Sequence, residues 1–533
     1  MSPAWKKAVH WIESNGGHIH ASLRYDDEER QVFLGLTSSG TPPIEKDTVL
    51  MTIPDVCLVS LHSVERDDSS PFGMSLFRVI HFLETMSRQS GESPPIKSPS
   101  DPSVGYRVGK TLYNNSQDVI LALYLSHLKE ISGGNSGNGE CHFFGPYLAT
   151  LPADSKFLPR QWPEESLSRR LFGTSLYRRA IEEREGVRRE YELVKKSWLS
   201  SNLGTEGNFP RFELYDGMLG CLTSRAFASL GFDGVDAMIP LLDLLNHARG
   251  HGCNGGENMV RYERYEKNGS EASSVPMVKR QKIPGGGVQV RTSKPVSEGS
   301  ALNMTYGAKS NATLLGRYGF CIDDNIEPDG SCNDVLEFEV KPGEPRVKLQ
   351  RGPKSYCYGP LIEALEMCTT SRQERGHESS DVEDESDGLD AFLNGCEEDG
   401  FGDSDGESDE QDCFYAGTME SDDLAVVKST DSGVEREIAA LQILESKLLE
   451  AKSILSKNPL SGICDKEGAM SDEDWYCSIL VRSELHTLTF YSGLCKAVLR
   501  RMRKEEFRSI GDIDSRHIEN TADVFLAIRH GSM

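Results

Sequence analysis

Residues 240–247 have the sequence Pro-Leu-Leu-Asp-Leu-Leu-Asn-His. This apolar segment carries one acid, Asp243, and ends in the polar pair Asn246 and His247. Alone, such a segment is more often a core strand or helix that ends at a capping Asn than a ligand site. About 60 residues later, Met304-Thr-Tyr306-Gly307 follows a predicted strand over residues 301–305, where a Tyr-Gly is usually a turn.

Two further segments complete a pattern. Lys309-Ser-Asn311 and Arg317-Tyr-Gly-Phe320 come next in the chain, and alone they indicate a short helix that ends at Gly319. In order, D-x-x-N-H, strand-T-Y-G-x-K-S-N and R-Y-G-F resemble the motifs of the SET-domain methyltransferases. The match is closest to the branch that includes the Rubisco large-subunit lysine methyltransferase. Other segments similar to that branch are SRAF at 224–227, FGPYLATLP at 144–152, WPEESL at 162–167, LFGTSL at 171–176 and LVRSE at 480–484.

The resemblance implies an α+β fold in which a SET-domain β-core carries a helical insert and an all-α substrate-binding domain follows. We expect the SET domain at 1–330, its insert at about 61–220, the helical domain at 331–520 and a disordered acidic insertion at 372–432. Apolar periodicity predicts helices at 5–14, 116–131, 434–457 and 475–502, and helices are also expected at 166–198, which has a dense Arg/Glu face, and at 211–227. Strands are expected at 31–36, 49–53, 288–291 and 301–305.

The chain has 533 residues and a net charge of -25, and its acidity is concentrated in one segment. Residues 376–427 contain 19 acidic and no basic side chains, which leaves only -6 for the rest. Such a segment cannot bury enough apolar area to fold, so we expect it to be disordered. Three roles remain open for it, namely a solvating linker, an electrostatic attractor for basic substrates and a phosphorylation target. A basic nucleic-acid footprint is absent, so no direct nucleic-acid binding is expected.

The cysteines and the apolar runs exclude several classes of protein. None of the 13 cysteines forms a CxxC or CxC pair, which argues against a zinc ribbon or a disulfide framework, and no metal site is expected. No run of about 18 apolar residues indicates a membrane span. The first helix belongs to the domain, so chloroplast import is not expected, and the sequence favours the cytoplasm, the nucleus or both. We expect a monomer.

The resemblance implies S-adenosylmethionine as the cofactor and a protein lysine as the methyl acceptor. Tyr306 is the catalytic candidate, because its hydroxyl could align the lone pair of the amine. Arg225 would pair with the carboxylate of the donor as a planar fork. Candidates for cofactor binding are Gly35, Leu36, Arg225, Asp243, Leu244, Leu245, Asn246, His247, Tyr318, Gly319 and Phe320. Candidates for substrate binding are Phe227, Tyr306, Lys309 and Tyr318.

Two positions bear on the alternatives. The branch usually carries G-x-G-L at its cofactor site, whereas this chain has Phe33-Leu-Gly35-Leu36, with Phe33 expected as a buried strand residue. Phe227 favours lysine, because the histidine methyltransferases of the branch have an Asn there that can hydrogen-bond an imidazole. We therefore expect a protein-lysine N-methyltransferase that acts on a non-histone protein, with a basic substrate among the possibilities. The alternatives are a protein-histidine methyltransferase and an inactive scaffold.

Overall fold

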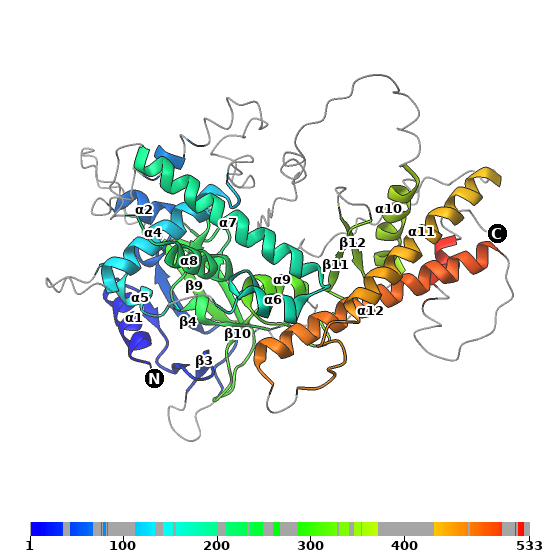
Figure 1. The fold of residues 1–533 in the computed structure, drawn as a ribbon. Helices are drawn as coiled ribbons and strands as arrows, with labels where there is room; N and C mark the ends of the chain where they lie inside the picture. The colour runs from blue at the N-terminus through cyan, green and yellow to red at the C-terminus, as the bar shows by residue number, and fades with distance from the viewer. Residues whose placement is uncertain are drawn as a thin grey trace. The chain divides into compact units, whose positions relative to one another are not determined.

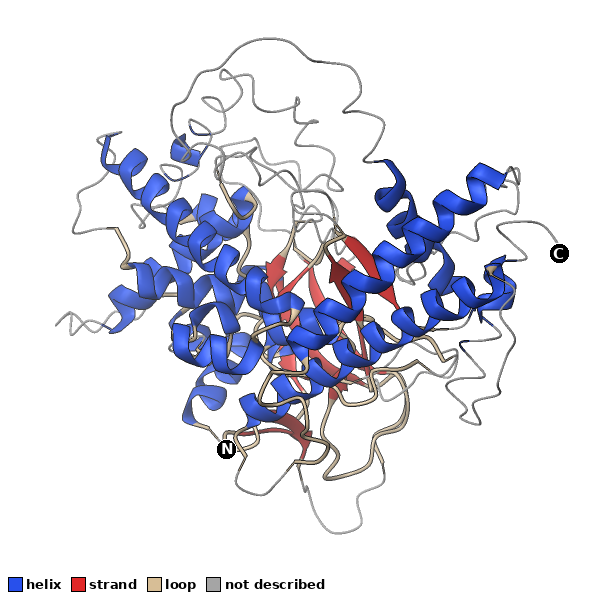
Figure 2. Ribbon diagram, turned by 45° about the vertical axis from the view of Figure 1, so that its right-hand side comes forward, coloured by secondary structure: helices blue, strands red, loops and turns tan. Residues whose placement is uncertain are grey.

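The chain divides into two compact units, and each is described separately. The first unit includes Met1–Gln161 and Glu182–Gly307, and the second includes Trp162–Ile181, Ala308–Gly400 and Gln411–Met533. Figure 1 labels the elements along the chain, and Figure 2 separates helices from strands. The structure, a computed structural model, describes residues 2–35, 43–67, 76, 78–80, 83, 112–133, 142–152, 156–200, 209–231, 235–248, 259–266, 286–327, 330–340, 346–352, 354–370, 431–466, 470–503, 518 and 521–526.

The main sheet of the first unit is antiparallel, in the strand order β1-β4-β9-β8. From Val288 to Thr292, β9 alternates buried and half-buried residues, because successive side chains point to opposite faces of a sheet. A Cβ at Gly287 would lie 2.2 Å from the carbonyl oxygen of Ile53, so glycine permits the close pairing of β4 with β9. The strands are β1 His18–Ile19, β4 Val49–Pro54, β8 Val260–Glu266 and β9 Gly286–Thr292.

Three smaller strand pairs complete the β-structure described in the first unit. The pair β7 and β10 is parallel, with Asn246 opposite Asn303 and His247 opposite Met304. This pairing brings together two segments that lie nearly 60 residues apart in the chain, and it positions the site described below. The six strands are β2 Leu23–Asp26 with β3 Gln31–Leu34, β5 Ala226–Phe227 with β6 Ala237–Met238, and β7 Asn246–His247 with β10 Asn303–Met304.

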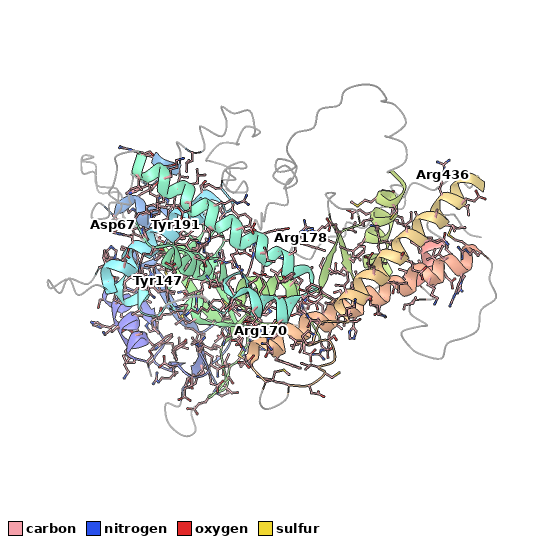
Figure 3. All side chains as sticks on the ribbon, viewed as in Figure 1. Asp67, Tyr147, Arg170, Arg178, Tyr191 and Arg436 are labelled. Carbon is pink, nitrogen blue, oxygen red and sulfur yellow. The ribbon has the colours of Figure 1, made fainter. Side chains whose placement is uncertain are left out.

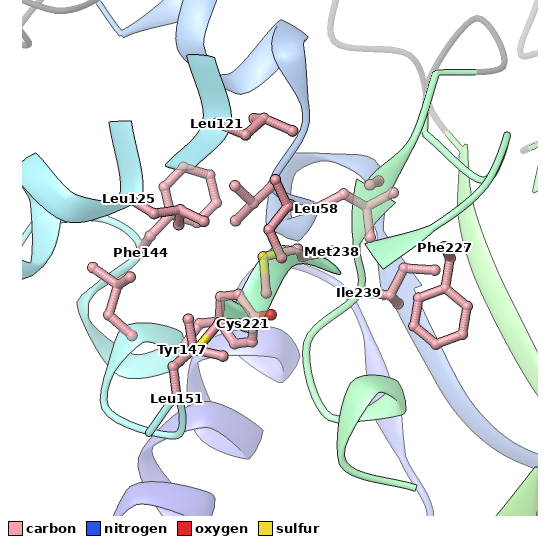
Figure 4. Packing of buried hydrophobic residues seen from close by; sticks show 14 of the residues in the cluster. Leu58, Leu121, Leu125, Phe144, Tyr147, Leu151, Cys221, Phe227, Met238 and Ile239 are labelled. Carbon is pink, nitrogen blue, oxygen red and sulfur yellow. The ribbon is translucent and has the colours of Figure 1, made fainter. Parts of the chain in front are cut away.

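Helices pack against these strands around one apolar core. In Figure 4, Leu125, Tyr147 and Cys221 come from three different helices and lie in the same cluster. Burial of each large apolar side chain stabilises the folded state by about 1.5–3 kcal/mol. The helical elements are α1 Pro3–Ser14, η1 Asp55–Cys57, α2 Leu61–Arg66, α4 Ser116–Gly133, α5 Gly145–Leu148, η2 Pro159–Gln161, α8 Phe212–Arg225 and η5 Leu242–Leu244, with most of α7 Ser175–Ser200.

A lysine holds the end of the short helix α5. The ammonium group of Lys129 donates hydrogen bonds to the carbonyl oxygens of Leu148, Leu151 and Pro152, at 3.1, 2.9 and 3.2 Å. The last carbonyls of a helix lack partners within the helix, and here the cation binds the carbonyl of Leu148, the last residue of α5, and two carbonyls of the segment that follows. Burial lowers the pKa of Lys129. The end of the FGPYLATLP segment at 144–152 is thereby fixed to α4, which carries Lys129.

The second unit has a helical core with a small antiparallel sheet. The long helices α11 and α12 pack along each other through buried leucines such as Leu444, Leu448 and Leu494, and both were expected from their apolar periodicity. The two-stranded sheet β11–β12 had no clear sequence signal. The elements are α6 Glu164–Leu171, the start of α7, α9 Asn311–Thr313, η6 Leu314–Tyr318, β11 Val335–Phe338, β12 Val347–Gln350, α10 Lys354–Thr370, α11 Asp431–Leu455 and α12 Asp472–Met502.

The expected α+β fold class is confirmed, with helices following the β-rich part of the chain. The single helix expected at 166–198 is wrong, because α6 ends at Leu171 and α7 begins at Ser175. Gly173 between them has φ +84°, a backbone conformation that only glycine adopts at little cost and that stops a helix. The domain boundaries remain predictions, and the acidic insertion at 372–432 lies outside the described residues except for its last two positions, where α11 begins. Among the described residues, no helix is both long and apolar enough to span a membrane.

A buried carboxylate of the second unit takes the place of an N-cap. Glu484 on α12 is 4% exposed and accepts hydrogen bonds from the backbone N–H and the hydroxyl of Ser175, the first residue of α7. Burial raises the pKa of Glu484 to about 7, although the Ser175 hydrogen bonds oppose this shift. The folded state therefore binds the proton more tightly than the unfolded state does. Stability from this group is greatest below about pH 4.5 and is lost as the pH rises through 7.

We expect Glu484→Gln to become more stable than the wild type as the pH rises from 5 to 8. The amide carries no charge to desolvate, and its oxygen can still accept from Ser175. The gain in the free energy of unfolding should reach about 1 to 3 kcal/mol at pH 8, measured by urea denaturation at several pH values. Glu473→Gln, in the first turn of α12, is the control and should show no such trend, because the Glu473 side chain is 46% exposed. A difference between Glu484→Gln and the wild type that stays constant over this pH range would contradict the prediction.

Candidate active site

Tyr306 follows β10 and lies against residues 245–247. Its backbone N–H donates to Nδ1 of His247 at 2.9 Å, and its hydroxyl donates to the carbonyl oxygen of Leu245 at 2.8 Å. The rings of Tyr306 and His247 have their centroids 5.0 Å apart. Because Nδ1 of His247 accepts a hydrogen bond, its neutral form carries the proton on Nε2. The parallel pairing of β7 with β10 thus fixes both ends of the tyrosine.

The hydroxyl of Tyr306 is protonated at neutral pH. Burial raises its pKa to about 12, and the negative charge of Asp243 adds to this effect while Arg225 opposes it. A phenol with this pKa is a poor general base. While the hydroxyl donates its hydrogen bond to the Leu245 carbonyl, its oxygen still has lone pairs that can accept a hydrogen bond from an amine. The residue is therefore suited to orienting a nucleophile.

Arg225 and Asp243 form a partly shielded ion pair next to this tyrosine. Nη1 of Arg225, at the last residue of α8, donates to the carbonyl oxygen of Asp243 at 2.7 Å and lies 3.6 Å from its carboxylate oxygen Oδ2. The Asp243 side chain is fully buried, and that of Arg225 is 22% exposed. Burial raises the pKa of Asp243 to about 6, although the positive charge of Arg225 opposes this shift. Nε of Arg225 is buried and has no hydrogen-bond partner among the described residues.

Tyr147 and Tyr25 are part of this cluster, and no role was predicted for either. The hydroxyl of Tyr147 on α5 donates to Oδ2 of Asp243 at 2.9 Å, and both groups are buried. Tyr25 on β2 lies close enough that Arg225 and Asp243 both influence its pKa, which burial raises overall. Tyr147 stands in the FGPYLATLP segment at 144–152, whose similarity to the Rubisco methyltransferase branch was the only sequence signal for this residue. Its partner is 96 residues away in the chain, so sequence alone did not link the two residues.

The backbone turns sharply just before Asp243. Leu241 has φ +69° and ψ -31° and is fully buried. A branched residue rarely adopts a positive φ, because its Cβ then crowds the backbone. The turn leads into η5, which places the carbonyl and the carboxylate of Asp243 on the same guanidinium nitrogen of Arg225.

The neighbouring candidates contribute in different ways. Leu244 and Leu245 are buried in the core, so Leu245 offers only its carbonyl oxygen to the site. Asn246 is exposed, and its side-chain amide donates to the carbonyl oxygen of Arg30 at 3.3 Å. Its exposure leaves this amide accessible to a ligand.

The glycine motif lies on the β2–β3 hairpin. Phe33 is a half-buried strand residue paired with Arg24, and Gly35 is buried at the end of the hairpin. A Cβ at Gly35 would lie 2.4 Å from Cγ of Arg24, so the glycine leaves room for that side chain. Leu36 lies outside the described residues.

Phe227 lies on β5, directly after α8 and Arg225. It is 8% exposed and packs edge to face against Tyr262 of β8, with the ring centroids 5.4 Å apart. Figure 4 shows its ring at the edge of the apolar cluster, near Ile239. The position is apolar and aromatic, as a channel for an alkyl amine requires.

The remaining candidates belong to the second unit. Tyr318 ends η6, Gly319 has φ +81° and caps that turn, and the ring of Phe320 packs edge to face against both Tyr318 and Tyr476. The carbonyl oxygen of Lys309 accepts a hydrogen bond from the side chain of Asn325. Tyr318, Phe320 and Tyr476 thus form a small aromatic cluster within this unit. The functional roles proposed for all of the candidates remain predictions.

The geometry of the first unit suits cofactor and amine binding. The partly exposed guanidinium of Arg225 has a buried Nε with no acceptor, so it fits a ligand carboxylate. Tyr306 provides a protonated hydroxyl, and His247 provides an imidazole whose Nδ1 accepts the Tyr306 N–H. Among the residues that the structure describes, no group of three or more His, Cys, Asp or Glu could hold a metal ion.

Comparison with known proteins identifies the fold. No family profile matches the sequence, and no curated protein matches it. The solved structures of similar fold include the SET domain of LSMT bound to lysine and AdoHcy, with a TM-score of 0.56 and 15% identity. They also include Rubisco LSMT bound to AdoMet, with a TM-score of 0.52 and 16% identity. Each match covers 98% of this chain and 96% of the other. The chain therefore has the SET-domain fold of the LSMT structures.

Proposed function

We propose that the protein is an S-adenosylmethionine-dependent protein-lysine N-methyltransferase. One observation carries the proposal. The protonated hydroxyl of Tyr306 is fixed on the Leu245 carbonyl beside the Arg225–Asp243 ion pair. The solved structures of the same fold were determined with AdoMet, AdoHcy, sinefungin, lysine or monomethyllysine, which supports this choice of ligands.

The residues of the first unit could hold both ligands. Arg225 would pair with the carboxylate of the cofactor, and Asn246 and His247 would hold its other polar groups. When bound, S-adenosylmethionine supplies the methyl group. Phe227 would line the path of the lysine side chain, and its apolar ring offers no hydrogen bond to an imidazole.

The acceptor amine must lose its proton before it can react. Free lysine has a pKa of about 10.4, so little of it is neutral at pH 7. An apolar enclosure favours the neutral amine by desolvation, and the cationic sulfonium of a bound donor would add repulsion of like charges. Tyr306 would then accept a hydrogen bond from the amine and hold its lone pair in line. We propose a non-histone protein substrate, and the acidic segment 376–427 favours a basic one.

The test uses the full chain, a labelled donor and a cell lysate. Incubation should label one or a few protein bands, and mass spectrometry should locate the added methyl groups on lysine. If the methyl groups are on histidine instead, lysine is the wrong acceptor and the protein is a protein-histidine methyltransferase. Failure to bind either AdoMet or AdoHcy in calorimetry would overturn it in favour of a scaffold.

Arg225→Lys should weaken binding of AdoHcy by roughly tenfold or more, measured by calorimetry. Lysine keeps the charge but loses the planar fork that pairs with a carboxylate. Arg264→Lys is a matched control, because Arg264 also donates to a backbone carbonyl and pairs with a buried acid, Asp55. We expect Arg264→Lys to leave the affinity for AdoHcy nearly unchanged. Equal losses in both variants would mean that Arg225 has only a structural role.

A further inference from the structure

Asp243 is a buried acid next to the Arg225 guanidinium, at a site that would bind a cationic donor. It is fully buried and accepts the Tyr147 hydroxyl at 2.9 Å, and its only cationic neighbour within 4 Å, among the described residues, is Arg225. Lys129 fixes the carboxyl end of α5, which carries Tyr147, so the phenol is held on a rigid element. Figure 3 labels Tyr147 among the side chains of the first unit. The free-energy cost of burying the ionised Asp243 must be offset by the charged groups beside it and by the hydrogen bond from Tyr147.

The net charges of the two cofactor forms differ by one. S-adenosylmethionine has a sulfonium, an ammonium and a carboxylate, and so carries a charge of about +1 at neutral pH. Its product, a thioether, has no sulfonium and is neutral overall. Arg225 with an ionised Asp243 is a neutral pair, whereas Arg225 alone would repel the sulfonium form more than the thioether.

We propose that Asp243, aimed by Tyr147, is the charge-balancing residue of this site. It would allow the cationic sulfonium donor to bind beside Arg225 and would set the preference for this donor over the uncharged thioether product. This inference rests on the proposed function. Asp243 is then a specificity residue, and Tyr147 is a positioning residue that acts through it.

The charged groups around Asp243 define how the preference depends on pH. Arg225 stays charged, and burial keeps the hydroxyls of Tyr147, Tyr25 and Tyr306 protonated, because it raises the pKa of each. Asp243, with a pKa of about 6, changes charge near neutral pH. The imidazole of His247 also lies in this cluster, against Tyr306. A variant of Asp243 is therefore needed to assign the pH dependence to its carboxyl group.

The experiment measures the dissociation constants of S-adenosylmethionine and S-adenosylhomocysteine by calorimetry between pH 5.5 and 8. In the wild type, the ratio of the donor constant to the product constant should rise as the pH falls through 6. Asp243→Asn should weaken donor binding at pH 7.5 by about tenfold and product binding by less than about threefold. Its ratio should therefore be high at pH 7.5 and should depend little on pH.

Tyr147→Phe provides a second variant in case Asp243→Asn does not fold. Loss of its hydrogen bond removes support for the ionised carboxyl, so the midpoint of the ratio should move up by roughly one pH unit. Tyr191→Phe is the matched control, because it removes a buried hydroxyl that donates to the Pro210 carbonyl at 2.7 Å in the same core. An unchanged ratio at pH 7.5 in Asp243→Asn would overturn the inference, as would an unmoved midpoint in Tyr147→Phe. If the wild type binds neither ligand, the proposed function itself fails, which is a different result.

Discussion

Replacing Tyr306 by Phe should lower kcat by roughly 100-fold or more, while the dissociation constant of S-adenosylhomocysteine stays within about threefold. The substitution removes one oxygen and leaves the ring beside His247. That oxygen is fixed by its hydrogen bond to the Leu245 carbonyl at 2.8 Å. Without it, a bound amine has no acceptor at this position and can point its lone pair away from the donor. The measurement is turnover with the substrate found in the lysate experiment, together with calorimetry.

The pKa of Tyr306 determines what this variant should show across pH. Because its pKa is about 12, the wild-type hydroxyl stays protonated over the working range. The loss in kcat should therefore be similar from pH 7 to 9. A loss that appears only above a certain pH would indicate a general base instead. Tyr191→Phe serves again as the control, and full activity in Tyr306→Phe would remove Tyr306 from the mechanism.

The sequence predicted the elements whose pattern is local. Apolar residues at helical spacing identified α11 and α12, because each helix buries one stripe against the same core. The break at Gly173 was missed, because the apolar spacing continues through it and only the positive φ reveals the turn. The short strands β11 and β12 were missed as well, since four residues carry too little periodicity to identify a strand.

The residues of the site were predictable only where their sequence motifs resemble those of the SET-domain methyltransferases. The resemblance singled out Tyr306, Arg225 and Asp243, and the structure brings these three residues together. It did not indicate that Tyr147 supports Asp243, since a hydrogen bond across 96 residues leaves no local pattern. The same holds for Glu484, which lies in a matched segment whose sequence does not show that it caps α7.

Asp334→Ala should lower the free energy of unfolding of the second unit by about 3 to 4 kcal/mol. The carboxylate of Asp334 is 8% exposed and is a hub for four donors. It accepts from the backbone N–H and the side-chain amide of Asn311 at 2.6 and 2.9 Å, from the amide of Asn325 at 3.0 Å, and from the hydroxyl of Ser483. Alanine would leave these buried donors without an acceptor, and each unsatisfied group costs about 1–3 kcal/mol before the structure relaxes.

The same hub explains why the effect should be cooperative. The side chain of Asn311 also forms hydrogen bonds with both the N–H and the carbonyl of Ile322. Loss of the Asp334 carboxylate would release Asn311 and so loosen the whole segment from 311 to 322. Urea denaturation monitored by circular dichroism measures the change. The control is Asp323→Ala, whose carboxylate is 53% exposed and pairs with Arg482 at the surface, and which should cost less than about 1 kcal/mol. If Asp334→Ala costs no more than Asp323→Ala, water replaces the carboxylate at this hub and the buried network does not stabilise the unit.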